Sequence, residues 1–176
     1  MSRNDHVHLF LCWLFAVINS RQPKYPFSPP FSDLFPEDSF QEHKVAGMNL
    51  KKFIHGKDRR SDQLLDWIEK GCFDALKKRY LKQAILTVLS DTTGPNNILE
   101  TYTLRVSYLS SLLHQGLDAG LSKLSLTRND QQILSLSTTS FTESMSKILR
   151  NLCVMSQTLN QLPQRKYLSM KLVYYE

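Results

Sequence analysis

The chain has 176 residues, of which 41% are hydrophobic and 22% charged, as is ordinary for a soluble globular protein. This length suits one compact domain and excludes a second full one. The formal net charge is +6, and most of the excess lies in residues 51–82, where ten lysines and arginines accompany five acids. A solvated helix face explains that basic segment best, and contact with nucleic acid or an acidic partner is the alternative.

The N-terminal segment differs in character from the remainder of the chain. Residues 9–18 (LFLCWLFAVI) form an apolar run that is too short to span a membrane. The run resembles the core of a signal peptide, but no small-x-small cleavage site follows it. Residues 22–33 carry four prolines and exclude a long helix or a central strand. A short first helix, a weak signal peptide and a segment foreign to the domain all remain open.

An amphipathic helix is predicted from Ser61 onward, with Ser61 or Asp62 as its N-cap. Two acid-first i,i+4 pairs support it, Asp66–Lys70 and Asp74–Lys78. Gly71 within the helix costs about 1 kcal/mol relative to Ala, so we expect a close packing contact there. The apolar stripe recurs at steps of three and four residues and consists of Leu64, Leu65, Ile68, Cys72, Phe73, Leu76 and Tyr80.

Two strands are predicted to follow the helix. Residues 84–89 (AILTVL) suit a short buried strand, and residues 91–97 (DTTGPNN) have the composition of a turn. Residues 98–109 alternate as a half-buried antiparallel strand does, and one face carries Tyr102, Leu104, Val106 and Tyr108. For residues 110–139, which are rich in Ser, Thr and Leu, we expect a surface loop with one weak helical turn at most.

A second helix is predicted from Ser140, where Ser140 and Glu143 have the spacing of a capping box, until the Leu162-Pro163 pair ends it. Residues 167–175 alternate and predict a final strand. The order is therefore helix, strand, strand, helix, strand. This order predicts an α+β fold in which a small antiparallel sheet carries its helices on one face.

No sequence signature of a metal site or of catalysis is present. The three cysteines (Cys12, Cys72 and Cys153) lie far apart and form no zinc-site spacing with each other or with histidine. They favour a reducing intracellular compartment over the secreted state that residues 9–18 alone would suggest. No Gly-rich phosphate loop, GxSxG or HExxH motif occurs. We therefore expect no metal, no cofactor and no enzymatic activity.

Three segments resemble those of a known protein family. They are residues 34–40 (LFPEDSF) followed by 48–53 (MNLKKF), residues 66–81 (DWIEKGCFDALKKRYL), and residues 162–176 (LPQRKYLSMKLVYYE). Together, in this order and spacing, they resemble the HORMA domain family in its meiotic chromosome-axis (Hop-one/HORMAD-like) branch. The resemblance covers about residues 33–176 and leaves residues 1–32 as a divergent, Pro-rich segment.

The resemblance implies a protein-binding adaptor. HORMA domains hold a short peptide, the closure motif, as a strand added to the sheet edge, and a C-terminal safety belt wraps over it and pairs with the opposite edge. The implied partners are closure-motif peptides of axis proteins or of the same family, cohesin-associated axis components and an AAA+ remodeller. The implied setting is the nucleus, on meiotic chromosomes, where such proteins control homologue pairing, synapsis and recombination.

The resemblance also carries site residues over to this chain. The expected peptide-binding edge strand comprises Tyr167, Leu168, Ser169, Met170, Lys171, Leu172 and Val173. The expected adjoining helix contributes Ile148, Leu152 and Met155. For the alternative function, weak sequence-independent DNA binding, the expected contacts are Lys77, Lys78, Arg79 and Lys82.

Two departures from the family pattern lead to further expectations. The family's chain continues after the last strand into the belt, whereas this sequence stops at Glu176. We therefore expect a partial domain that cannot trap a closure motif by itself. Family members also carry a long amphipathic helix before the LFPE turn, which the prolines exclude here. We hypothesise that residues before about Asp33 derive from an alternative exon or an untrimmed intron.

Overall fold

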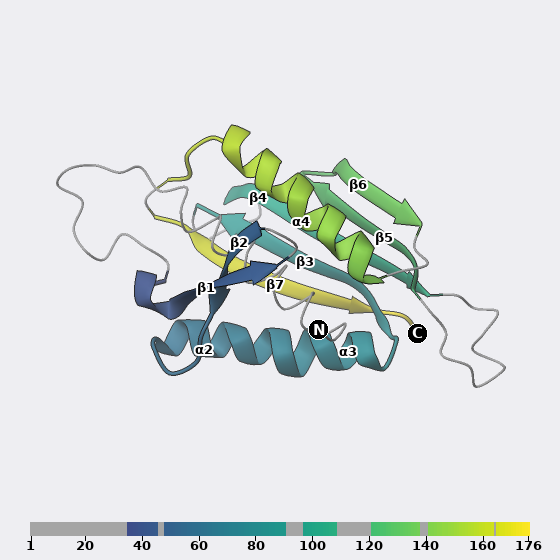
Figure 1. Ribbon diagram of the computed structural model, residues 1–176, viewed down its shortest axis with the longest axis horizontal. Coiled ribbons are helices and arrows are strands. Elements are labelled where there is room, and N and C mark those ends of the chain that lie inside the picture. The colour runs from purple at the N-terminus through teal and green to yellow at the C-terminus, as the bar shows by residue number, and fades with distance from the viewer. Residues whose placement is uncertain (1–34, 46–47, 91–96, 109–120, 138–140, 164) are drawn as a thin grey trace.

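The computed structural model describes residues 35–45, 48–90, 97–108, 121–137, 141–163 and 165–176. The predictions for residues 9–18, the proline-rich segment and Ser140 fall outside these ranges. The elements run in the following order (Figure 1): η1 (Glu37–Ser39), β1 (Phe40–Val45), β2 (Met48–Phe53), α2 (Arg59–Asp66), η2 (Trp67–Cys72), α3 (Phe73–Lys77), β3 (Leu81–Leu89), β4 (Ile98–Tyr108), β5 (Leu121–Arg128), β6 (Gln131–Ser137), α4 (Phe141–Thr158) and β7 (Tyr167–Tyr174).

The described strands form one antiparallel sheet of five strands, in the order β6-β5-β4-β3-β7, and a separate β1–β2 hairpin. Leu86 of β3 lies opposite Tyr102 of β4 on one side and Met170 of β7 on the other. Helix α4 packs over β5 and β6, at the end of the sheet away from β7. The α2–α3 helix runs along the β7 side (Figure 1). The predicted α+β class with an antiparallel sheet is confirmed.

The first described helix runs through residues 59–77 as α2, η2 and α3. Its N-cap is Asp58, whose carboxylate accepts hydrogen bonds from the backbone N–H groups of Arg60 and Ser61. The cap predicted at Ser61 or Asp62 was therefore wrong, because both residues already lie inside the helix. Asp58 has the extended backbone that a cap requires. The two predicted i,i+4 pairs are present, each at 2.8 Å.

The middle of this helix is a π-helical segment, η2. Such segments accommodate an extra residue and are frequent at functional sites. Gly71 lies in it, and a Cβ built there would meet Leu172 Cδ1 of β7 at 3.3 Å. The predicted close packing contact is confirmed. Because the helix approaches β7 at this point, η2 fixes the distance between the helix and the sheet edge.

A single apolar core joins the helices to the sheet. Tyr102, Leu104 and Val106 of β4 are buried, as the alternation predicts. Leu168 and Leu172 of β7 are partly buried and pack against the same cluster, which contains buried residues from four further elements: Leu65, Ile68 and Cys72 of the first helix, Leu81 and Val88 of β3, Leu124 and Leu126 of β5, and Ile148 and Leu149 of α4. The packing of all these elements into one core makes β7 an edge of a rigid body.

The β1–β2 hairpin begins earlier than the resemblance suggests. Residues 48–53, the expected first strand, form β2, and β1 precedes them. Phe35, Phe40 and Phe53 hold the hairpin against the core, with ring centroids of Phe35 and Phe53 4.9 Å apart and those of Phe40 and Phe53 4.4 Å apart. Phe35 and Phe53 are buried, so the chain is anchored where it enters the sheet region.

The loop predicted for residues 110–139 was wrong for residues 121–137, which form the β5–β6 hairpin. Leu124 and Leu126 alternate with Ser and Thr and are buried. Asn129 and Asp130 connect the strands with φ of 47° and 62°, as in a type I′ turn, because short polar side chains tolerate positive φ. The Asn129 side chain accepts a hydrogen bond from the backbone N–H of Thr101. The hairpin covers the outer side of β4, which is therefore an interior strand.

Candidate functional site: the β7 edge and its groove

Strand β7 forms one edge of the five-stranded sheet. Its inner side pairs with β3 along the whole strand, and no strand in the described part of the chain pairs with its outer side. An edge of this kind presents backbone N–H and C=O groups that can pair with another strand. The side chains of Tyr167, Ser169 and Lys171 are exposed, whereas Leu168, Met170 and Leu172 are half-buried, so the strand has a polar face and an apolar face.

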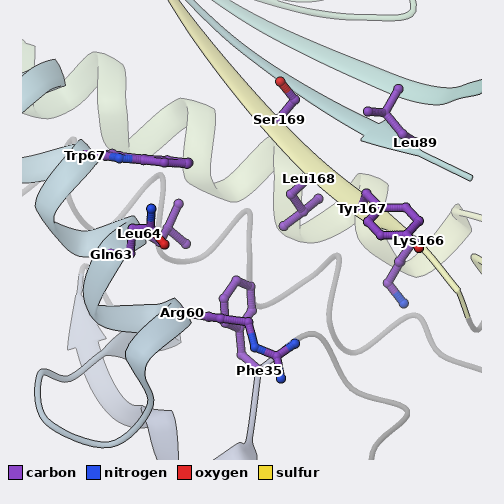
Figure 2. A pocket seen from close by; sticks show the side chains of 10 residues that line it. All are labelled: Phe35, Arg60, Gln63, Leu64, Trp67, Leu89, Lys166, Tyr167, Leu168 and Ser169. Atoms are coloured by element: carbon purple, nitrogen blue, oxygen red, sulfur yellow. The ribbon is translucent and has the colours of Figure 1, made fainter. Parts of the chain in front are cut away.

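A groove separates β7 from the α2–η2 helix. Its first part is a pocket of about 540 Å³, and Figure 2 shows the ten residues that line it: Phe35, Arg60, Gln63, Leu64, Trp67, Leu89, Lys166, Tyr167, Leu168 and Ser169. Its second part is a pocket of about 580 Å³ lined by Gln63, Asp66, Trp67, Lys70, Gly71, Met170 and Leu172. Gln63 and Trp67 line both pockets, so the two lie next to each other between the helix and β7, and we call them together the β7 groove.

The walls of the β7 groove are largely apolar. Leu64 and Trp67 approach from the helix, and Leu168 faces them from the strand (Figure 2). Trp67 is 48% exposed, which leaves a large aromatic surface in water. Exposed apolar surface beside an unpaired strand edge can receive the apolar side chains of an added strand. The groove therefore suits a peptide that pairs with β7 and covers Trp67.

Charges are distributed unevenly along the groove. The first pocket contains two cationic side chains, Arg60 and Lys166, and no acidic one among its lining residues. Arg60 is exposed, whereas Lys166 is only 5% exposed. In the second pocket, the Lys70 ammonium forms an ion pair with Asp66 Oδ1 at 2.8 Å, so the opposite charges there compensate each other.

The two groups of sequence-predicted site residues lie in different places in the structure. The seven predicted edge-strand residues lie on β7, at the sheet edge. In α4, Ile148 is fully buried and Met155 packs against the core. The side chain of Leu152 falls outside the described part. Neither Ile148 nor Met155 lines the groove.

Sequence reasoning missed the helix that does line the groove. Its residues Arg60, Gln63 and Trp67 lie outside the apolar stripe of the first helix, where polar or exposed side chains are normally solvated. Trp67 was the available signal, since a large aromatic residue outside the stripe needs another partner.

The basic residues proposed for DNA contact lie around the turn from α3 to β3. Lys77, Lys78 and Lys82 are exposed. Lys78 pairs with Asp74 at 2.8 Å; this hydrogen bond lowers the pKa of Asp74 and raises that of Lys78. The Lys82 ammonium lies 5.6 Å from the centre of the Tyr175 ring. Part of the basic charge is therefore already engaged within the chain.

The far end of β7 is fastened to the sheet by its two final tyrosines. The backbone N–H of Tyr175 donates to the carbonyl of Tyr80 at 2.7 Å, and its hydroxyl donates to the carbonyl of Val106 in β4 at 2.8 Å. The ring of Tyr174 packs on that of Tyr80 with centroids 5.1 Å apart. These contacts hold the edge strand in place at the end remote from the first pocket.

Within the described ranges, no cluster of three or more metal-ligating side chains occurs. The helices described there are all too short or too polar to cross a membrane. An unpaired strand edge beside an apolar groove is the geometry of a peptide-binding module that extends its sheet with a partner strand.

The chain belongs to the HORMA domain family, whose sequence model matches residues 31–176. It is 31% identical over 145 residues to HORMA domain-containing protein 2 of Mus musculus, covering 81% of this chain and 44% of the relative. It is 29% identical over 147 residues to the meiosis-specific protein ASY1 of Arabidopsis thaliana, covering 81% and 24%. The predicted family and its meiotic branch are confirmed. The chain spans less than half the length of these relatives.

Solved structures share the fold. The structure of Caenorhabditis elegans HTP-2 bound to the HIM-3 closure motif matches with a TM-score of 0.64 and 17% identity, covering 97% of this chain and 67% of that one. A chain of the mitotic checkpoint complex matches with a TM-score of 0.60 and 9% identity, covering 98% and 72%. At such low identities the likeness concerns the fold alone.

Proposed function

We propose that this protein is a non-enzymatic adaptor of the meiotic chromosome axis that binds a closure-motif peptide as a strand added to β7. The observation that carries the proposal is the position of β7, whose outer edge opens onto the β7 groove. Two further facts support it. Relatives of the chain are meiosis-specific proteins, and a protein of the same fold, HTP-2, binds a closure motif.

Binding of this kind needs no chemical step. Backbone hydrogen bonds between the peptide and β7 supply affinity without regard to sequence, and alternate side chains supply selectivity. Side chains on the apolar side of the added strand would meet Trp67 across from Met170. Covering the exposed half of Trp67 contributes about 2–3 kcal/mol, at about 25 cal/mol per Å² of apolar surface.

The same proposal assigns partners and a location. The partners are closure-motif peptides of axis proteins or of its own family, cohesin-associated axis components, and an AAA+ remodeller that releases the peptide. The location is the nucleus, on meiotic chromosomes, and the roles are homologue pairing, synapsis and control of recombination. Residues 33–176 form the HORMA part, and residues 1–32 form a divergent segment. The names of two relatives, the meiosis-specific proteins ASY1 and HOP1, support the meiotic setting.

Backbone methylation of the peptide tests strand addition directly. Peptides are selected on the full chain from a displayed library of random sequences, and the HIM-3 closure motif serves as a further probe. Each bound peptide is then synthesised with a single N-methyl group at successive positions. An added strand directs alternate N–H groups toward its partner, so methylation at every second position should abolish binding. Equal effects at all positions, or no bound peptide at all, would refute the proposal.

Sequence-independent DNA binding through Lys77, Lys78, Arg79 and Lys82 is the alternative function. The ion pair with Asp74 neutralises the charge of Lys78 that would meet phosphate, and the Lys82 ammonium lies over the Tyr175 ring within the chain. We therefore place peptide capture first. DNA retention that is strong at low salt and lost at physiological salt would support the alternative.

A further inference from the structure

The five-stranded sheet has one face packed on the core and a second face that no described helix covers. Ala84 of β3, Leu104 of β4 and Leu172 of β7 lie in one row across the sheet and pack in or against the core. Helix α4 and the β1–β2 hairpin lie on that side, in front of the sheet in Figure 1. Because side chains alternate along a strand, the neighbouring odd-numbered positions point to the other face. This open face consists of the odd-numbered residues within 83–87, 101–107, 123–127, 135–137 and 169–173.

The open face is polar and positively charged. Its charged residues are Arg105, Lys123 and Lys171, all three are cations, and the side chain of each is exposed. None of the three forms an ion pair with another residue of the described ranges. Hydroxyl side chains fill most of the remaining positions, among them Thr87, Thr101, Thr103, Ser125, Thr127 and Ser169. Positive charge on this surface is therefore not compensated by acidic side chains of the same face.

The three cations lie on a diagonal across the sheet. Lys171 and Thr103 share a row and lie on strands two apart. Arg105 is two residues further along β4, so its Cα lies about 12 Å from that of Lys171. Arg105 pairs with Ser125 of β5, and Lys123 is its diagonal neighbour on that strand, at about 7–8 Å. The cations therefore form a stripe about 20 Å long that crosses four strands.

Such a surface suits the phosphate backbone of a nucleic acid duplex. Lysine and arginine neutralise phosphates and release their counterions, and Ser and Thr hydroxyls donate hydrogen bonds to phosphate oxygens. Binding of a single strand depends instead on aromatic side chains on which the bases stack, and the open face contains none. A protein partner would need apolar anchors that become buried, and small hydroxyl side chains offer these little contact. The duplex backbone is therefore the partner that matches best.

We propose that the open face binds the backbone of duplex DNA without regard to sequence, through Arg105, Lys123 and Lys171. This surface is separate from the basic turn between α3 and β3, and it leaves the outer edge of β7 free to pair with a peptide. The choice of DNA as the duplex rests on the proposed location on chromosomes. Peptide capture itself is independent of the open face, so either activity can fail without the other.

The salt dependence of binding measures the number of phosphate contacts. The full chain is titrated into a fluorescently labelled DNA duplex of about 20 base pairs, and its anisotropy is followed between about 50 and 200 mM salt. Three contacts predict a slope of about −2.7 in log K against log salt concentration, which is an affinity loss of about fortyfold over this range. A second duplex of equal length and different sequence should give the same affinity and the same slope, and a strong preference for one sequence would overturn the proposal.

Two triple variants with the same loss of net charge locate the contact. The first combines Arg105→Gln, Lys123→Gln and Lys171→Gln, and it should abolish most of the binding, while each single change should reduce the slope by about 0.9. The control combines Lys77→Gln, Lys78→Gln and Lys82→Gln at the basic turn, whose side chains are also exposed, and it should bind DNA as the parent does. Equal losses in the two triple variants would show a general effect of net charge. Loss in the control alone would place the contact at the turn, and either result overturns the inference.

A carboxylate placed among the cations provides a second test. Ser125 is the cross-strand partner of Arg105, so Ser125→Glu should weaken DNA binding as strongly as the first triple variant. Gln131→Glu makes the same change in charge at an exposed position of β6 and should have little effect. Two competitors identify the partner. Poly-glutamate that displaces the labelled duplex as well as unlabelled duplex does would point to an acidic protein segment. A single strand that binds more tightly than the duplex would show base contacts, and each of these results would refute the proposal.

Discussion

Gly71 of the π-helical segment and Leu172 of β7 approach so closely that a Cβ on Gly71 would lie 3.3 Å from Leu172 Cδ1. Both residues line the second pocket of the β7 groove. The contact therefore has two consequences. It packs the helix against the edge strand, and it sets the distance between the helix and β7 at one end of the second pocket.

The substitution Gly71→Ala separates these two consequences. Ala removes a helix penalty of about 1 kcal/mol, and the half-buried Leu172 can move by the few tenths of an ångström that the new methyl group needs. We expect the free energy of unfolding in urea to rise by up to about 1 kcal/mol, while the affinity for groove-binding peptides falls severalfold. A loss of stability instead would show that Leu172 is held rigidly.

The predictions from sequence succeeded where one element carries a strong period. The stripe of residues 61–80 and the alternation of residues 98–109 each identify an element with one buried face, because burial of that face fixes the spacing of its apolar residues. Residues 121–137 alternate as well, but their Ser and Thr content suggested a loop, and the two-residue turn at Asn129 and Asp130 was not recognised. Its positive φ values are typical of hairpins.

The groove could not be predicted in the same way. Its lining comes from four separate parts of the chain: Phe35, residues 60–71, Leu89 and residues 166–172. No local period links such segments, and only the packing of the helix beside β7 brings them together. The resemblance indicated correctly that residues 167–173 form a strand. It also named residues of α4 as the adjoining helix, and α4 packs over β5 and β6.

The ion pair between Glu100 of β4 and Arg128 of β5 should stabilise the pairing of these two strands. The Glu100 side chain is 6% exposed, receives a hydrogen bond from Arg128 Nη2 at 2.6 Å and a second from the Tyr102 hydroxyl at 2.7 Å. The substitution Arg128→Met leaves this carboxylate buried without its cation. We expect a loss of about 2–4 kcal/mol in urea unfolding, less than for a fully buried pair because Arg128 is partly exposed.

The control for this prediction is Arg105→Met, at an exposed position of β4, which should change stability by less than about 0.5 kcal/mol. The double variant Glu100→Gln with Arg128→Met removes the charge and keeps an acceptor for Tyr102. It should recover most of the loss. Equal stability of Arg128→Met and Arg105→Met would contradict the role given to the pair.

Cys72 should make stability depend on pH in the alkaline range. Its side chain is fully buried, and burial raises the pKa of the thiol from 9.0 to about 12. The folded chain therefore keeps a proton that the unfolded chain releases above about pH 9. Stability from this group is complete below the unfolded pKa and is lost as pH rises toward the folded pKa, by about 1.4 kcal/mol per pH unit.

The measurement compares the free energy of unfolding of the parent chain and of Cys72→Ala between pH 8 and about 10.5. Other groups titrate alike in both, so the parent should lose stability more steeply above pH 9. In a chain that retains Cys72 as its single cysteine, after Cys12→Ser and Cys153→Ser, a thiol reagent should react only at the rate of unfolding. Two results would contradict the burial of the Cys72 thiol. One is the same pH dependence of the free energy of unfolding in the parent and in Cys72→Ala, and the other is labelling of Cys72 faster than unfolding.

The last prediction concerns the fastening of β7 by Tyr175. Its hydroxyl donates to the Val106 carbonyl across β3, so Tyr175→Phe should destabilise the fold by about 1 kcal/mol, the usual net value of such a bond. Tyr174→Phe keeps the ring contact with Tyr80 and serves as the matched control, with a smaller effect expected. Amide exchange distinguishes a local effect from a global one. Faster exchange should appear first in β7 near Leu172 and Val173, because these residues lie next to the released end, and uniform acceleration across the sheet would contradict local fastening.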